Sequence, residues 1–190
     1  MPRLFTALEV PRDVGMTLSM LRGGLPGARW IDVENYHITL SFIGDIDDGL
    51  ARDVAEALDR VRRPGVDVTI DGVDAFGGAR PKSVYARVLP TPPLMELQAV
   101  QERLLRRLGV SIENRQYTPH ITLARLRSEA TARLTADWLA LRGGGRLSFA
   151  ADRFVLYSSR DSVGGGPYIV EEAYPLTRQG ADGREARMTV

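Results

Sequence analysis

The chain has 190 residues, of which 44% are hydrophobic and 26% charged, and its formal net charge is +1 at pH 7. These values are typical of a globular protein that is long enough to bury a core, and they give no overall positive field for nucleic acid or anionic membranes. The chain has no cysteine, which excludes disulfide scaffolds, cysteine-ligated zinc, iron–sulfur clusters and thiol nucleophiles. No apolar run approaches the roughly 18 residues of a membrane span, and residues 1–9 reach an acid too early for a signal peptide, so we expect a cytoplasmic protein.

The spacing of apolar residues predicts strands and helices along most of the chain. Period-2 runs indicate strands, and apolar residues three and four apart indicate helices. In the first half of the chain the expected elements are, in order, strand 4–8, helix 11–21, strands 30–31 and 36–43, and helix 47–61 with Asp47 as its N-cap. They are followed by strands 66–73 and 83–89, helix 91–108, strand 120–124, helix 128–142 with Ser128 as its N-cap, and strands 147–157 and 168–176.

This order of elements, with hairpin-like strand pairs and no uniform βαβ alternation, favours an α+β fold. We expect one bilobal domain at residues 1–177, in which two pseudo-symmetric antiparallel sheets carry helices on their outer faces and enclose a central cleft. Residues 178–190 are predicted to be a polar C-terminal tail, and 164–166 a glycine loop whose motion the sequence leaves open. We expect a monomer.

The two histidines of the chain, His37 and His120, begin the same tetrapeptide, His-Ile-Thr-Leu. From the composition, the chance that a given histidine is followed by these three residues is roughly one in 3,500. Side chains alternate between the faces of a strand, so each histidine shares a face with the threonine two positions on, Thr39 or Thr122. The isoleucine and leucine occupy the opposite face. Packed about a pseudo-twofold axis, two such strands would form a polar cleft.

Two histidines near neutral pH can supply one base and one acid, and a threonine hydroxyl can donate a hydrogen bond to a phosphoryl oxygen. This set suits cleavage of a phosphodiester without a metal. A strained cyclic phosphate is a suitable substrate, because it needs positioning and proton transfer more than charge neutralisation. The alternatives are a purely structural role for both histidines and a zinc site, although no HExxH motif or cysteine partner supports zinc.

The repeated motif and its flanks resemble the two-histidine phosphoesterase superfamily, and within it the bacterial and archaeal RNA 2',3'-cyclic phosphodiesterases, also called RNA 2'-5' ligases. The resemblance covers about residues 3–176, and the flanks that carry it are 3–8, 29–30, 42–45, 118–119, 124–125, 154–159 and 174–176. It implies a bilobal fold with a central cleft. The implied activity is hydrolysis of a terminal RNA 2',3'-cyclic phosphate to a 2'-phosphomonoester, with no cofactor and no metal.

The family pattern also implies a role for each matching residue: His37 as proton donor to the departing 3' oxygen, His120 as proton acceptor from water, Thr39 and Thr122 as phosphate ligands, and Arg125 as a phosphate or product contact. Pseudo-symmetry makes the two histidines locally alike, so the choice of acid and base follows from the resemblance alone. Strict alternation from His120 places Arg125 on the opposite face of the strand. It reaches the cleft only if the strand twists, bulges or ends near Ala124.

Four further residues are candidate substrate contacts. Phe5 and Tyr157 lie in segments that match the family and could stack on the terminal base. Arg80 and Lys82 lie in a loop rich in glycine and proline, where they could follow an RNA backbone.

Three alternatives for the function stay open at this point. The modest net charge suits a small substrate, such as ADP-ribose cyclic phosphate or a nucleoside 2',3'-cyclic phosphate. The same site run in reverse would be an RNA 2'-5' ligase. An RNA-end binding protein could keep the cleft without turnover, although both histidines and both threonines are intact.

Overall fold

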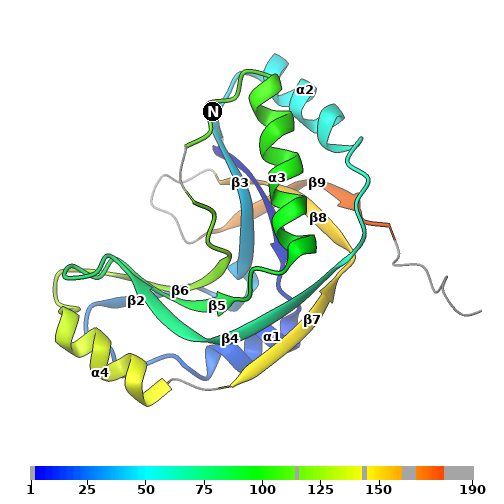
Figure 1. The fold of residues 1–190 in the computed structure, drawn as a ribbon. Helices are drawn as coiled ribbons and strands as arrows, with labels where there is room; N and C mark the ends of the chain where they lie inside the picture. The colour runs from blue at the N-terminus through cyan, green and yellow to red at the C-terminus, as the bar shows by residue number, and fades with distance from the viewer. Residues whose placement is uncertain (1–2, 114–115, 143–144, 160–165, 178–190) are drawn as a thin grey trace, which may run out of the picture.

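The computed structural model describes residues 3–113, 116–142, 145–159 and 166–177 (Figure 1). The predicted tail at 178–190 lies outside the described residues, as do the first two glycines of the 164–166 loop. The strands are β1 (Arg3–Glu9), β2 (Ala28–Trp30), β3 (His37–Asp45), β4 (Val66–Phe76), β5 (Ser83–Val88), β6 (His120–Leu126), β7 (Arg146–Ala151), β8 (Arg153–Ser159) and β9 (Tyr168–Pro175). The helices are α1 (Arg12–Ser19), the short 3-10 helix η1 (Val33–Asn35), α2 (Asp48–Leu58), α3 (Pro92–Arg107) and α4 (Ala132–Arg142).

These strands form one sheet in the order β7-β4-β5-β6-β3-β1-β8-β9, with β2 added on β6. We call β1, β3, β8 and β9 the first half, and β2, β4, β5, β6 and β7 the second half. The halves join where β3 meets β6, and the residue pair in register there is Ile38 and Ile121. Both are the second residue of the repeated tetrapeptide, so the pseudo-twofold axis passes between them. The predicted α+β fold is confirmed, and its two lobes share a single antiparallel sheet.

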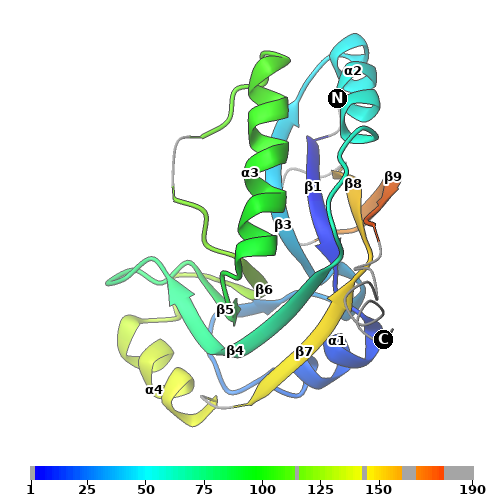
Figure 2. The ribbon, with the colours of Figure 1, turned by 45° about the vertical axis from the view of Figure 1, so that its right-hand side comes forward.

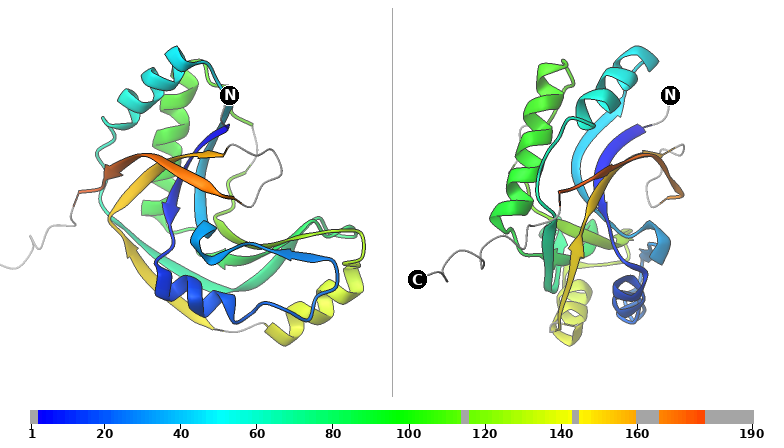
Figure 3. Two further views of the ribbon diagram at one scale, coloured as in Figure 1. Left: turned by 180° about the vertical axis from the view of Figure 1, so that it is seen from behind. Right: turned by 90° about the vertical axis from the view of Figure 1, so that its right-hand side faces the viewer.

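The helices cover the outer faces of the sheet and cross between its halves. Helix α1 follows β1 of the first half but packs on β7 of the second (Figure 2). Helix α3 follows β5 of the second half and packs on both β3 of the first half and β4 of the second. Helix α2 lies against α3 beside the first half, and α4 contacts β4 beneath the second (Figure 3).

The core of the first half forms between β3 and α3, and it fixes the direction of the histidine strand. Ile38 and Leu40 are at most 2% exposed, as are Leu94 and Leu97 of the helix. Complete burial of such a side chain contributes about 1.5–3 kcal/mol. With its even-numbered positions held in this core, the start of β3 must present His37 and Thr39 on the other face.

Two helix starts show where the sequence predicted a cap correctly and where it did not. The Asp47 side chain accepts hydrogen bonds from the backbone N–H groups of Gly49 (2.9 Å) and Leu50 (3.0 Å), a cap of about 1 kcal/mol. Ser128 is not the cap of α4. The helix begins at Ala132, and its Leu134 N–H donates to Thr131 Oγ1 at 3.3 Å.

The expected strand 147–157 is two strands that belong to different halves. It breaks at Asp152, between β7 and β8. Strand β7 pairs with β4 in the second half, and β8 pairs with β1 in the first. None of the helices that the structure describes combines the length and the apolarity required to traverse a bilayer.

Candidate active site

The two histidines stand at the first residue of β3 and of β6, on either side of the pseudo-twofold axis. His37 Nδ1 lies 2.8 Å from the carbonyl oxygen of Asn35, and His120 Nδ1 lies 2.7 Å from that of Thr118. A carbonyl oxygen only accepts hydrogen bonds, so Nδ1 carries a proton in both rings. In the neutral imidazoles, Nε2 is therefore the basic nitrogen of each. A backbone contact to the carbonyl two residues earlier thus produces the same tautomer in both histidines.

The strand register brings each histidine beside the threonine of the other half. In an antiparallel pair centred on Ile38 and Ile121, position 37 faces position 122 and position 39 faces position 120. The two histidines and two threonines are half-buried, whereas the two isoleucines are fully buried. The four polar side chains predicted from the tetrapeptides thus gather at one junction.

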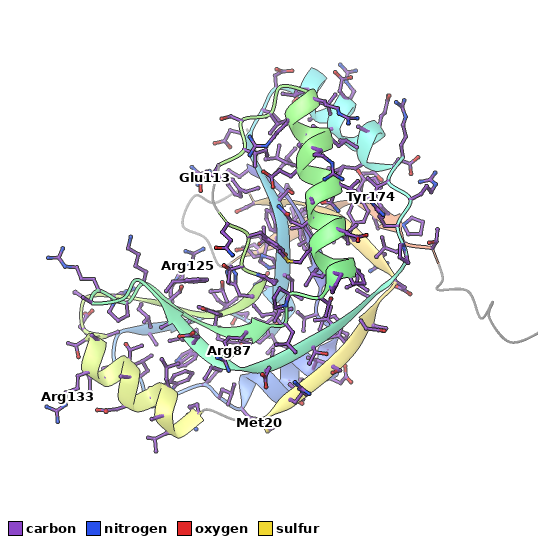
Figure 4. The ribbon with its side chains drawn as sticks, viewed as in Figure 1. Met20, Arg87, Glu113, Arg125, Arg133 and Tyr174 are labelled. Atoms are coloured by element: carbon purple, nitrogen blue, oxygen red, sulfur yellow. The ribbon has the colours of Figure 1, made fainter. Side chains whose placement is uncertain are left out.

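A β-bulge in β6 returns Arg125 to the face of this junction. On β5, Val84 pairs with Ala124, and the next residue, Tyr85, pairs with Thr122, so Leu123 is an extra residue on β6. Leu123 and Ala124 are consecutive and both fully buried, which shows the shift in alternation. The exposed Arg125, labelled in Figure 4, then falls on the side of Thr122, and its positive charge acts on His37 of the other half.

Three aromatic rings surround His37. Its ring centroid lies 5.1 Å from that of Phe5, 5.9 Å from Tyr157 and 5.0 Å from Tyr168. The pKa of His37 is lowered to about 4, mainly by burial, to which these rings contribute. The positive charges of His120 and Arg125 act in the same direction, and the backbone hydrogen bond to Asn35 opposes them. His37 is therefore neutral at pH 7 in the ligand-free protein.

Phe5 and Tyr157, the two predicted base contacts, belong to this aromatic wall. Phe5 is 5% exposed and Tyr157 is 8% exposed, because each packs against the other and against His37. At these exposures little of either ring is accessible to a ligand. The structure places both beside the site, and their contact with substrate stays a prediction.

Two other rings accompany His120. The centroid of Phe76 lies 4.8 Å from that of the imidazole and the centroid of Tyr85 lies 5.2 Å from it, and the two rings stack on each other at 4.1 Å. Phe76 was not predicted as a site residue. Its position at the end of β4, directly before two glycines, gave no signal, because the contact depends on how β4 and β5 pair.

Tyr117 is a second residue of the site that the sequence did not single out. Its hydroxyl donates a hydrogen bond to the carbonyl oxygen of Thr39 at 2.9 Å, so it ties the segment before His120 to β3. Burial raises the pKa of Tyr117 well above its usual value, which keeps the hydroxyl protonated as a donor.

A row of basic residues runs outward from the site across the second half. Arg125 on β6 pairs with Arg29 on β2 at one side and with Ser83 on β5 at the other, and cross-strand partners share a face. Arg80 and Lys82, the predicted backbone contacts, are exposed in the connection that leads into Ser83. This connection ends directly before Ser83, the residue of β5 that pairs with Arg125. Arg29 was not predicted as a contact.

Within residues 3–113, 116–142, 145–159 and 166–177, no three histidine or acidic side chains come together as a metal site. The expectation that the reaction needs no metal stays a prediction.

Comparison with known proteins gives consistent matches over most of the chain. A family described as LigT like phosphoesterase matches residues 8–85 and 88–168. The chain is 28% identical to the RNA 2',3'-cyclic phosphodiesterase of Escherichia coli over 93% of this chain and 97% of that protein. It is 30% identical to the protein of the same name from Thermotoga maritima, over 88% and 92%. The crystal structure of E. coli LigT complexed with 3'-AMP has a TM-score of 0.78 at 27% identity, covering 93% of this chain and 99% of that one.

Proposed function

Because the chain belongs to the LigT-like phosphoesterase family, we propose that it is an RNA 2',3'-cyclic phosphodiesterase that opens a terminal cyclic phosphate to a 2'-phosphomonoester. The observation that carries this proposal is the pair of histidines with Nδ1 bonded to backbone and Nε2 as the reactive nitrogen, each beside a threonine. This arrangement offers two proton-transfer sites and two hydroxyl donors around one point.

In the proposed reaction, His120 Nε2 accepts a proton from water as the water oxygen attacks phosphorus. The bond from phosphorus to the 3' oxygen breaks, and His37 Nε2 gives that oxygen a proton. The hydroxyls of Thr39 and Thr122 and the guanidinium of Arg125 donate hydrogen bonds to the other phosphate oxygens, where negative charge gathers in the transition state.

The role of His37 as acid requires that it carry a proton when substrate is bound. Burial lowers the pKa of His37 to about 4 in the free protein, where the positive charges of His120 and Arg125 also face it. A bound phosphate anion reverses the sign of that field and supplies an acceptor for Nε2–H, so it raises the pKa. The opposite assignment, with His37 as base and His120 as acid, needs no such change.

The two assignments can be separated by NMR, because the chain contains only two imidazoles. We expect the His37 pKa to rise from about 4 toward neutrality when a nucleoside 2'-phosphate binds. A His37 pKa that stays near 4 in the complex would reverse the roles of the two histidines.

The basic row favours an RNA strand over a small nucleotide as the substrate. Arg29 and Arg125 are adjacent across two strands, and Arg80 and Lys82 are exposed in the connection that leads into β5. Phosphates of preceding nucleotides would lie along this row. The names of the relatives favour hydrolysis over the reverse, ligating reaction. A cytoplasmic monomer remains our proposal for the state of the protein, and light scattering would measure its mass.

The experiment that tests the function uses a short RNA ending in a 2',3'-cyclic phosphate, incubated in EDTA with the wild-type protein, His37→Ala or His120→Ala. We expect the wild type to form a 2'-phosphate and both variants to lose that activity. A nucleoside 2',3'-cyclic phosphate, compared at equal concentration, separates the RNA substrate from a small one. Tight binding of the RNA without turnover by the wild type would instead indicate an RNA-end binding protein.

A further inference from the structure

Arg87 of β5 lies beside His120, on the side away from the pseudo-twofold axis. The two residues are partners across β5 and β6, so their side chains share a face of the sheet. Tyr85, two positions earlier on β5, confirms that face, because its ring centroid lies 5.2 Å from that of His120. Arg87 is exposed, and its side chain is labelled in Figure 4. A guanidinium therefore lies on the face of the site, one strand beyond a histidine.

A β-bulge in β4 holds the guanidinium of Arg87 in place. Two residues of β4, Asp71 and Gly72, lie opposite Arg87 alone. Arg87 Nε donates a hydrogen bond to the carbonyl oxygen of Asp71 at 2.8 Å. Gly72 has a φ of +77°, and a Cβ there would come within 3.0 Å of Arg87 Nη2, so a glycine leaves room for the guanidinium. The bond to Asp71 uses one of the five N–H donors of the group, and the others can bind an anion.

The equivalent position in the first half carries the opposite charge, and there the charge is neutralised. Glu9 of β1 is the partner of His37 across β1 and β3, as Arg87 is the partner of His120. The Glu9 carboxylate forms an ion pair with Arg153 at 2.7 Å. No acidic side chain among the residues that the structure describes forms an ion pair with Arg87. The positive charge beside His120 therefore remains for a ligand.

One acidic residue, Asp74 of β4, shares this face, because it is the cross-strand partner of Tyr85. Its carboxylate accepts a hydrogen bond from the backbone N–H of Ala75 at 2.7 Å. Burial and the Asp74 carboxylate raise the pKa of Tyr85, and the charge of Arg87 opposes them. Asp74 thus acts on the Tyr85 hydroxyl and on its own backbone, without forming an ion pair with Arg87.

We propose that Arg87 binds a second phosphate of the substrate, the one on the 5' oxygen of the nucleotide whose cyclic phosphate reacts. This inference rests on the proposed function. His120 and Arg125 lie toward opposite ends of β6, so a reacting phosphate held by Arg125 leaves the rest of the nucleotide to extend toward His120. Neighbouring strands are about 4.8 Å apart, which puts Arg87 within reach of a group one ribose away from the reacting phosphate. A guanidinium held in one orientation suits the oxygens of a phosphate.

The experiment compares adenosine 2',3'-cyclic phosphate with its 5'-phosphorylated form, which differs only at the 5' oxygen. We expect the wild type to have a KM about tenfold lower for the 5'-phosphorylated compound at similar kcat, as one hydrogen bond to a charged group predicts. Arg87→Gln should bring the two KM values together, and Arg87→Lys should keep part of the difference. Added salt should reduce the difference in the wild type, because it screens an exposed charge.

Two further variants serve as matched comparisons. Arg133→Gln removes one exposed positive charge from α4, outside the site, and should keep the preference for the 5'-phosphorylated compound. Arg29→Gln removes one from the basic row at the other end of β6. If Arg29→Gln loses the preference and Arg87→Gln keeps it, the 5' phosphate lies on the basic row and the inference is wrong.

The outcomes separate this inference from the function on which it rests. If the wild type cleaves both compounds with equal KM, or if Arg87→Gln keeps the preference, the role of Arg87 is wrong and the phosphodiesterase remains. If the wild type cleaves neither, the proposed function fails, and calorimetry then tests the second phosphate site by binding alone. We expect the wild type to bind adenosine 2',5'-bisphosphate about tenfold more tightly than adenosine 2'-phosphate, and Arg87→Gln to bind the two equally. Equal affinities in the wild type would overturn the inference.

Discussion

The two halves of the sheet hold their histidines by the same backbone contact but surround them differently. Three rings enclose His37, whose pKa falls to about 4, whereas two stacked rings from β4 and β5 accompany His120. The carbonyl group two residues before each histidine therefore determines which nitrogen reacts, and the neighbouring strands determine the proton affinity of that nitrogen. A symmetric frame can in this way support an asymmetric proton transfer.

The strongest test of this comparison removes one imidazole at a time. His37→Gln and His120→Gln should each lower kcat/KM for the cyclic-ended RNA by about 10²- to 10⁴-fold, because each removes a proton-transfer group. In EDTA, the plot of rate against pH from 5 to 8 should lose its acidic limb in one variant and its basic limb in the other. If a variant keeps wild-type activity, the histidine that was replaced takes no part in the mechanism.

The environment of His37 also predicts how stability depends on pH. Its folded pKa of about 4 lies below the unfolded value of 6.5, so the unfolded chain takes up the proton first as pH falls. Stability is complete above pH 6.5 and decreases toward pH 4, by at most about 3 kcal/mol. Urea denaturation at pH 7.5 and 4.5 measures the loss, which should shrink in His37→Gln and persist in His120→Gln. An equal loss of unfolding free energy between pH 7.5 and 4.5 in wild type and His37→Gln would contradict the low pKa assigned to His37.

The two threonines test whether the phosphate lies on the pseudo-twofold axis. Thr39→Val and Thr122→Val keep the side-chain shape and remove one hydroxyl donor each. A hydrogen bond to a charged group contributes about 1.5–3 kcal/mol, so each variant should lose roughly 10- to 100-fold in kcat/KM. Equal losses indicate a centred phosphate, and a loss in one variant alone indicates a phosphate held by one half.

The smallest expected effect concerns the hydrogen bond between the Tyr117 side chain and the backbone of β3. Tyr117→Phe removes the hydrogen bond to the Thr39 carbonyl and should lower the free energy of unfolding by about 1 kcal/mol. Activity should fall only a few-fold, because the hydroxyl positions Thr39 through its backbone. Thermal denaturation and kinetics on one preparation check both numbers, and loss of activity as large as in Thr39→Val would indicate direct contact with substrate.

The sequence predicted the parts of the site that depend on local pattern. Alternating residues around His37 and His120 sufficed to place both strands and to pair each imidazole with a hydroxyl. Asp47 could be recognised as a cap because its partners lie two and three residues away. Ser128 failed as a cap because Thr131 offered the same chemistry three residues later, nearer the true start of α4.

The parts that depend on register between distant strands could not be predicted in the same way. The position of Arg125 requires an extra residue on β6 opposite β5. A bulge has no signature within its own tetrapeptide, because it is created by the pairing. The break of the strand at Asp152 is similar, since it marks where the chain leaves one partner strand and joins another.

The crossing of α1 and α3 between the halves has a consequence for how such a molecule can be divided. A chain cut at Pro90, between β5 and α3, would separate α3 from β3 and β4, on which it packs, and α1 from β7. Each piece would also contain strands of both halves, so neither piece would hold a continuous sheet. The two repeats therefore have to fold together as one unit.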